Sequence, residues 1–194
     1  MGSFATDAKW ASRFLDLSLH VAQWSKHPTC KVGAVIVRPD RTVASMGFNG
    51  PPRGVSDRSA FQNGSKHSRT IHAELNAILS SAVSVRGYEL YCSMPICDRC
   101  ACHVIQAGIT RVSVIETFDD ALGPKWAESF AEAKFLFDEA GIVVTEYMPM
   151  AGGLSKILDR TPSPIRRSKA KKGSETQKKP RQVQRQSART QRGS

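Results

Sequence analysis

The sequence lacks the features that would place it in a membrane or in an oxidising compartment. Its 194 residues contain no run approaching the roughly 18 to 20 apolar residues that a membrane-spanning helix needs, and no signal-peptide pattern opens the chain. Five cysteines are present, and an odd number without a secretory signal argues against a disulfide framework. We therefore expect a cytoplasmic protein with no membrane partner, whose cysteines serve another purpose.

Acidic side chains are almost absent from the last part of the chain. Residues 161–194 carry eleven Lys or Arg against one acid, Glu175, and so account for +10 of the net charge of +11. Residues 1–160 carry 17 basic and 16 acidic side chains and are nearly neutral. Beyond about Asp159 the chain also loses apolar residues, and such a segment cannot bury enough surface to fold alone. We predict one domain over residues 1–160 and a disordered basic tail over 161–194.

The apolar pattern of residues 1–160 predicts helices that alternate with strands. Expected helices cover residues 5–24, 72–81, 97–107 and 125–140, and expected strands cover 32–37, 42–46, 88–93, 111–115 and 142–147. The first two strands are expected to form a hairpin. Alternating strands and helices favour a layered α/β domain with a partly parallel sheet. The polar stretch from Ser56 to Thr70 is expected to cover or flank a site.

Two short motifs carry chemistry, and each lies at the start of an expected helix. They are His72-Ala73-Glu74 and Cys97-Asp98-Arg99-Cys100. One His and two Cys make three zinc ligands and leave the fourth tetrahedral position open to water, which is typical of a catalytic site. Bound zinc lowers the pKa of water from about 15.7 toward about 7. Glu74 is not needed as a ligand and can move protons. The combination is the signature of the zinc nucleobase deaminases.

Other interpretations of the same residues explain less of the pattern. A Cys-x-x-Cys pair alone is also found in thioredoxin-like redox sites and in structural zinc ribbons. A ribbon needs a second cysteine pair, whereas Cys30 and Cys92 are isolated, and a redox pair leaves the His-Ala-Glu motif without a role. Cys102 is expected to face away from the site. A second zinc at His67 is a further hypothesis.

Several motifs together resemble one family. They are Ser25-Lys26-x-Pro28, Val32-Gly33-Ala34-Val35-Ile36-Val37, Gly47-Phe48-Asn49-Gly50-x-Pro52, His72-Ala73-Glu74-Leu75-Asn76-Ala77-Ile78, Cys97-x-x-Cys100-Ala101 and Ile105-Gln106-Ala107-Gly108-Ile109. From about Phe14 to Tyr147 the chain resembles the deoxycytidylate (dCMP) deaminases. The resemblance implies the three-layer cytidine deaminase-like fold, with a mixed central sheet flanked by helices. In one respect the chain departs from the family: Ile96 stands where the family usually has proline.

The resemblance also implies a reaction and a cofactor. The reaction is hydrolytic deamination of dCMP to dUMP, in which hydroxide on one zinc ion per chain attacks the ring and Glu74 shuttles protons. The implied substrate-binding residues are Ser25, Lys26, Asn49, Arg53 and Ala73. Among them, Asn49 is expected to contact the sugar. A lysine, an arginine and the groups near Ser25 suit the 5′-phosphate.

Partners and regulation follow from the same resemblance. It implies a homo-oligomer, with a hexamer as one form, and regulation by dCTP and by dTTP with Mg²⁺. The alternative substrates are dCTP, a modified cytosine nucleotide, or nucleic acid in the form of tRNA adenosine or single-strand cytosine. The basic tail suits nucleic acid or another polyanion, but the folded part is nearly neutral. A purely structural zinc protein would have no use for Glu74.

Overall fold

The computed structural model describes residues 8–61, 68–116, 124–150 and 153–160. The predicted tail over 161–194 and the second zinc predicted at His67 lie outside the described residues, and the division at residue 160 stays a prediction. In the described part of the chain, no helix has the length and apolar character needed to cross a membrane.

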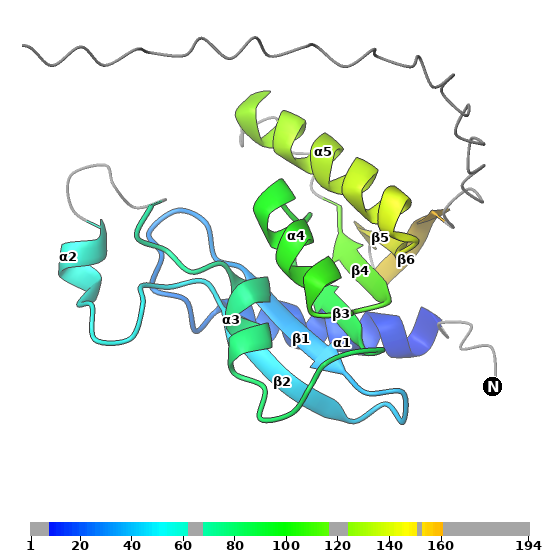
Figure 1. Cartoon of the computed structure of the whole chain (residues 1–194), viewed down its shortest axis with the longest axis horizontal. Helices are drawn as coiled ribbons and strands as arrows, with labels where there is room; N and C mark the ends of the chain where they lie inside the picture. The colour runs from blue at the N-terminus through cyan, green and yellow to red at the C-terminus, as the bar shows by residue number, and fades with distance from the viewer. Residues whose placement is uncertain (1–7, 62–67, 117–123, 151–152, 161–194) are drawn as a thin grey trace, which may run out of the picture.

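A six-stranded mixed sheet forms the middle layer (Figure 1). In spatial order its strands are β2 (Val43–Phe48), β1 (Gly33–Val37), β3 (Glu89–Cys92), β4 (Arg111–Ile115), β5 (Val143–Met150) and β6 (Gly153–Arg160). The pairs β3–β4 and β4–β5 are parallel, and the other three pairs are antiparallel. The expected hairpin and the partly parallel sheet are therefore confirmed.

The sequence predicted no strand after residues 142–147, and this is wrong. The strand β5 runs on to Met150, and β6 returns antiparallel beside it. Residues 153–160 show no alternation of apolar and polar side chains, which is why the pattern did not predict a strand there. The backbone pairing with β5, a tertiary contact, defines this strand.

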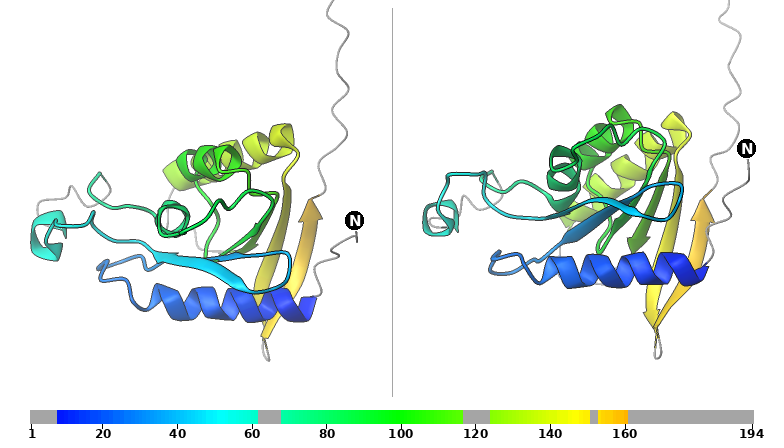
Figure 2. Two further views of the ribbon diagram at one scale, coloured as in Figure 1. Left: turned by 60° about the horizontal axis from the view of Figure 1, so that its bottom comes forward. Right: turned by 90° about the horizontal axis from the view of Figure 1, so that it is seen from below.

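Helices cover both faces of the sheet (Figure 2). They are α1 (Ala8–Ala22), α2 (Asp57–Phe61), α3 (Ala73–Leu79), α4 (Asp98–Gln106) and α5 (Pro124–Ala140). The helix α1 covers one face, whereas α3, α4 and α5 lie on the other, and α2 lies apart at the end of the molecule. The three layers that the sequence implied are confirmed.

The strand β1 separates two hydrophobic cores. All five of its residues are buried. Val35 and Val37 pack with α1 residues such as Phe14, whereas Ala34 and Ile36 pack with residues of α3 and α4. A strand that is buried on both faces reads as an uninterrupted apolar run, as this one does.

The backbone of α3 packs directly against the sheet. This helix begins immediately after His72. A side chain at Gly47 would put its Cβ 2.3 Å from the Ala77 nitrogen and 2.5 Å from the Ala73 oxygen, so only glycine leaves room for the helix. In the same strand, the Ser45 hydroxyl donates a hydrogen bond of 2.8 Å to the Ala77 carbonyl. The position of α3 is thereby tied to β2.

Candidate functional site

Two helices begin with residues that can bind a metal. His72 immediately precedes the first turn of α3, and Cys97 immediately precedes the first turn of α4. Both have extended backbones, and neither side chain caps its helix. Their carbonyls accept the first helical hydrogen bonds, from Asn76 at 2.9 Å and from Ala101 at 2.8 Å. The backbone thus enters each helix while the imidazole and the thiol stay available to a ligand.

The fold brings together the three residues that the sequence predicted as zinc ligands. His72 Nδ1 lies 3.4 Å from Cys97 Sγ and 3.4 Å from Cys100 Sγ, and all three donor atoms lie within 4.8 Å of one another. In the described part of the chain this is the one such cluster. One imidazole nitrogen and two sulfurs are a donor set that zinc prefers, and three protein ligands leave a fourth position open. The residues present therefore fit a catalytic zinc ion.

The two cysteine sulfurs have different electrostatic environments. A hydrogen bond from Cys100 and a second contact with His72 lower the pKa of Cys97 to about 4. The same pairing with Cys97, together with burial, raises the pKa of Cys100. The hydrogen bond with Cys97 raises the pKa of His72. The pairing thus favours the thiolate at Cys97, and metal binding would release the protons that the donor groups still carry.

Glu74 lies in the first turn of α3, outside the cluster of donor atoms. It is only 4% exposed. Burial raises the pKa of its carboxyl to about 7, although a backbone hydrogen bond and the neighbouring His72 and Cys100 oppose this increase. A carboxyl with a pKa near neutrality can both accept and donate a proton at physiological pH. The environment of Glu74 is therefore that of an acid–base group.

Two contacts place Asn49 beside the metal-binding segment. Gly50 and Ile71 exchange backbone hydrogen bonds of 3.1 and 2.8 Å, which sets the residue after Asn49 opposite the residue before His72. Asn76 of α3 donates a side-chain hydrogen bond of 2.9 Å to the Phe48 carbonyl. The role of Asn76 was not predictable from its motif, because its hydrogen-bond partner is 28 residues away.

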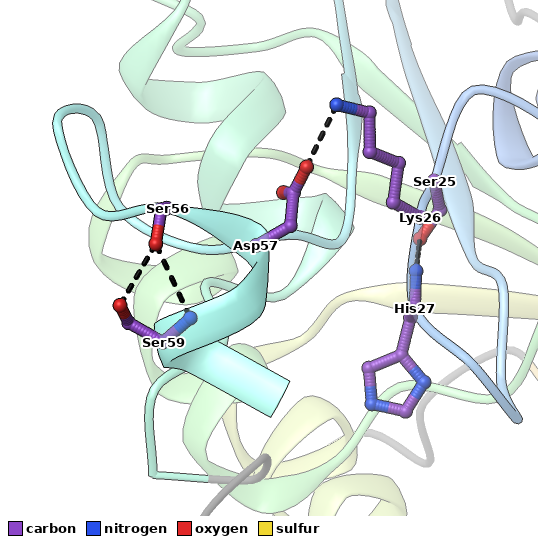
Figure 3. A network of polar contacts seen from close by, with 6 residues as sticks. All are labelled: Ser25, Lys26, His27, Ser56, Asp57 and Ser59. Atoms are coloured by element: carbon purple, nitrogen blue, oxygen red, sulfur yellow. Dashed lines mark hydrogen bonds and ion pairs between the residues drawn. The ribbon is translucent and has the colours of Figure 1, made fainter. Parts of the chain in front are cut away.

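The other predicted substrate-binding residues occupy different environments. The Ser25 hydroxyl donates a hydrogen bond of 2.7 Å to the Asn49 carbonyl, so these two residues are brought together. Lys26 instead forms an ion pair of 2.7 Å with Asp57 at the start of α2 (Figure 3). Arg53 is exposed in the loop after β2, and Ala73 is fully buried in the first turn of α3. Their roles toward a substrate stay predictions.

The helix α5 contributes to the site in a way that the sequence did not predict. The Trp126 ring lies 6.2 Å from the His72 ring, measured between centroids. One turn later, the Ser129 hydroxyl donates to the Asp98 carboxylate at 2.7 Å and accepts from the Asp98 nitrogen at 3.2 Å. Trp126 and Ser129 lie on one face of the expected helix. That shared face was the only sequence feature that pointed to a contact with the site, and many helices have it.

Comparison with known proteins identifies the family. Residues 8–116 match the family described as the cytidine and deoxycytidylate deaminase zinc-binding region. A relative named "Uncharacterized deaminase in luxG 3'region", from Aliivibrio fischeri, is 39% identical over 144 residues, which cover 74% of this chain and 96% of that protein. Deoxycytidylate deaminase from Homo sapiens is 32% identical over 150 residues, which cover 73% of this chain and 81% of the human protein. The chain therefore belongs to the cytidine and deoxycytidylate deaminase zinc-binding family, whose members are hydrolytic deaminases.

Solved structures show the same fold. The dCMP deaminase of cyanophage S-TIM5 in its apo form superposes with a TM-score of 0.57 at 23% identity, covering 73% of this chain and 99% of that chain. The same enzyme in complex with dCMP and dUMP gives a TM-score of 0.53 at 23% identity and covers 75% and 98% of the two chains. At this identity the likeness establishes the fold alone, and it confirms the predicted cytidine deaminase-like architecture.

Proposed function

We propose that this chain hydrolyses dCMP to dUMP and ammonia at the site formed by the starts of α3 and α4. The position of Glu74 carries the proposal. Its carboxyl is buried two residues from His72, yet it is not one of the three clustered donors. A structural zinc site has no use for such a neighbour, whereas a hydrolytic deaminase needs a group that transfers protons.

The division of labour follows from the chemistry of the side chains. His72, Cys97 and Cys100 would hold one zinc ion, which when bound would act as a Lewis acid and make water acidic and nucleophilic at neutral pH. Glu74 accepts the proton that the water gives up. It passes protons first to the ring nitrogen beside the carbon under attack and then to the departing amine. One water is consumed for each dCMP, and one ammonia is released for each dUMP.

The choice of dCMP rests on the loop beside the metal-binding residues and on the relatives. Asn49 is assigned the sugar, because the Gly50–Ile71 bridge holds it next to the metal ligand His72. The groups around Ser25, with Lys26 and Arg53, are assigned the 5′-phosphate, and the buried start of α3 at Ala73 lines the site. Relatives that are 32 to 33% identical are named deoxycytidylate deaminases.

The test is ammonia release by the full chain from dCMP, dCTP, deoxycytidine, cytidine and a tRNA anticodon stem-loop, with zinc assayed in parallel. We expect turnover of dCMP and one zinc per chain. Preferential turnover of dCTP or of the RNA would overturn the substrate assignment. A Glu74→Gln variant that keeps its zinc is expected to lose activity, and retained activity would remove Glu74 from the mechanism.

Assembly and regulation belong to the same proposal. We expect a homo-oligomer, with a hexamer as one form. Light scattering of the full chain measures its mass. Activation by dCTP and inhibition by dTTP with Mg²⁺ are expected in the dCMP assay. A monomer whose rate does not respond to either nucleotide would contradict this part of the proposal without affecting the assigned reaction.

A further inference from the structure

A buried histidine organises the loop that leads from α1 to β1. His27 is 4% exposed, and its Nδ1 accepts hydrogen bonds from the backbone nitrogens of Cys30, at 3.0 Å, and Thr29, at 3.4 Å. A ring nitrogen that accepts a hydrogen bond from N–H carries no proton, so His27 is a neutral imidazole with its proton on Nε2. Nδ1 therefore serves as an acceptor for backbone groups of its own loop.

These hydrogen bonds extend to Asn49. Cys30, whose nitrogen is held by His27, accepts through its carbonyl a hydrogen bond of 2.8 Å from Asn49 Nδ2. Asn49 Oδ1 in turn accepts from the Val32 nitrogen at 2.9 Å. Cys30 thus links the Nδ1 of His27 to the side-chain amide of Asn49, and Val32 gives that amide a second hydrogen bond to the same loop.

A second connection closes the network around Asn49. The Ser25 hydroxyl accepts a hydrogen bond of 3.1 Å from the His27 backbone nitrogen and donates one of 2.7 Å to the Asn49 carbonyl. Ser25 is 2% exposed and Asn49 is 6% exposed, so these hydrogen bonds are shielded from water. Buried and fully connected polar groups of this kind hold one conformation.

The imidazole of His27 also makes an aromatic contact. An experiment has to distinguish this packing from the hydrogen bonds that Nδ1 accepts. It lies edge-to-face against Phe61 of α2, with 5.4 Å between centroids. Its neighbour Lys26 extends in the opposite direction and reaches Asp57 (Figure 3). Phenylalanine at position 27 would keep the ring without the acceptor, whereas asparagine would keep an acceptor for the N–H groups two and three residues on.

We propose that His27 is a positioning residue for substrate binding. Its Nδ1 holds Cys30 so that the amide of Asn49 is fixed facing the sugar of the nucleotide. The amide keeps one further N–H and one further lone pair beyond its bonds to Cys30 and Val32, and these are the groups offered to the sugar. His27 itself does not touch the reacting atoms. The inference rests on the proposed function, because it concerns the residue assigned to the sugar. It predicts an effect on KM rather than on kcat, since the metal-binding helices are not part of this network.

Steady-state kinetics with dCMP provide the test. In His27→Phe, loss of the acceptor is expected to raise KM by about tenfold, the equivalent of one hydrogen bond, with kcat and zinc content unchanged. His27→Asn is expected to recover most of the wild-type KM. His20→Phe, which alters an exposed histidine of α1, is the matched control and should leave both constants unchanged. A wild-type KM in His27→Phe, or equal KM values in His27→Phe and His27→Asn, would overturn the proposal.

Two further measurements do not depend on turnover. Amide exchange of Cys30 in the substrate-free protein is expected to be faster in His27→Phe than in wild type and in His27→Asn, and unchanged exchange in His27→Phe would refute the network. The ¹⁵N spectrum of wild-type His27 must show an unprotonated Nδ1, which keeps the proposal testable if a variant does not fold. Absence of dCMP turnover in wild type would refute the proposed function instead.

Discussion

His72 and Cys97 occupy equivalent positions in two different helices: each is the residue before the first turn, and neither uses its side chain as a cap. Side-chain atoms at such positions commonly satisfy the free N–H groups of the first turn. Here they face one another at 3.4 Å instead. The start of α3 and the start of α4 therefore meet as a pair, and the metal would link the two helices.

Zinc retention should depend on Cys97 and not on the neighbouring exposed cysteine. Serine is a poor zinc ligand compared with a thiolate, so Cys97→Ser is expected to leave almost no zinc on the protein after equilibration with a competing chelator. Cys102→Ser changes an exposed thiol on the same helix and should retain one zinc per chain. Equal zinc content in the two variants, measured by atomic emission, would remove Cys97 from the metal site.

Glu74 should make the stability of the metal-free protein depend on pH. Its pKa is about 7 in the folded state against the ordinary 4.5, so the folded protein binds this proton more tightly than the unfolded chain. The free energy of unfolding therefore falls as pH rises from 4.5 to about 7 and is level above that. At about 1.36 kcal/mol per pKa unit, the full cost is about 3 kcal/mol.

The Glu74→Gln substitution removes the free-energy cost of ionising the buried carboxyl. At pH above the folded pKa, the metal-free variant is expected to be more stable than the metal-free wild type by up to about 3 kcal/mol. Below the pKa of Glu74 in the unfolded chain, the carboxyl is protonated in both the folded and the unfolded wild type. The wild type and the variant should then be equally stable. Urea unfolding at both ends of this range measures the difference, in which the titration of groups that do not interact with Glu74 cancels. Equal stability throughout would show that the carboxyl is not desolvated.

The close approach of β2 and α3 should make Gly47 intolerant of any side chain. The Cβ of Gly47→Ala would meet three backbone atoms of α3, which cannot rotate away. The expected loss of stability is about 1 to 3 kcal/mol, and zinc affinity should fall because His72 immediately precedes α3. Gly50→Ala is the control, since its Cβ would meet only a Phe48 ring atom at 3.9 Å. Similar urea-unfolding midpoints for both variants would contradict the packing argument.

The ion pair between Lys26 and Asp57 should compete with the 5′-phosphate of the substrate. Asp57→Asn frees the lysine, so KM for dCMP is expected to fall, while KM for deoxycytidine, which has no phosphate, stays the same. The pair is exposed, which limits the expected decrease to about two- to fivefold. Asp40→Asn, in the β1–β2 turn, serves as a charge-matched control. An equal change in KM for dCMP and for deoxycytidine would show that Lys26 does not bind the 5′-phosphate.

The chemistry of the site was predictable because it is encoded locally. Cys97 and Cys100 lie one turn apart in any helix that begins there, and His72 and Glu74 have a similarly short spacing. The order of helices and strands was also predictable, since alternating and helical periodicity reflect burial. The strand β6 was not predicted, because its partner and not its own pattern makes it a strand.

The sequence by itself thus determined the class of reaction, the candidate metal-donor residues and the layered α/β architecture, because these depend on residue types, on short spacings within each motif and on the order of the elements along the chain. Only the tertiary structure decided which loops surround the donors. The Gly50–Ile71 bridge, the bond from Asn76 to Phe48 and the pairing of Lys26 with Asp57 join segments 21 to 31 residues apart. Such contacts depend on how the elements pack together, and the local pattern around either partner does not predict them.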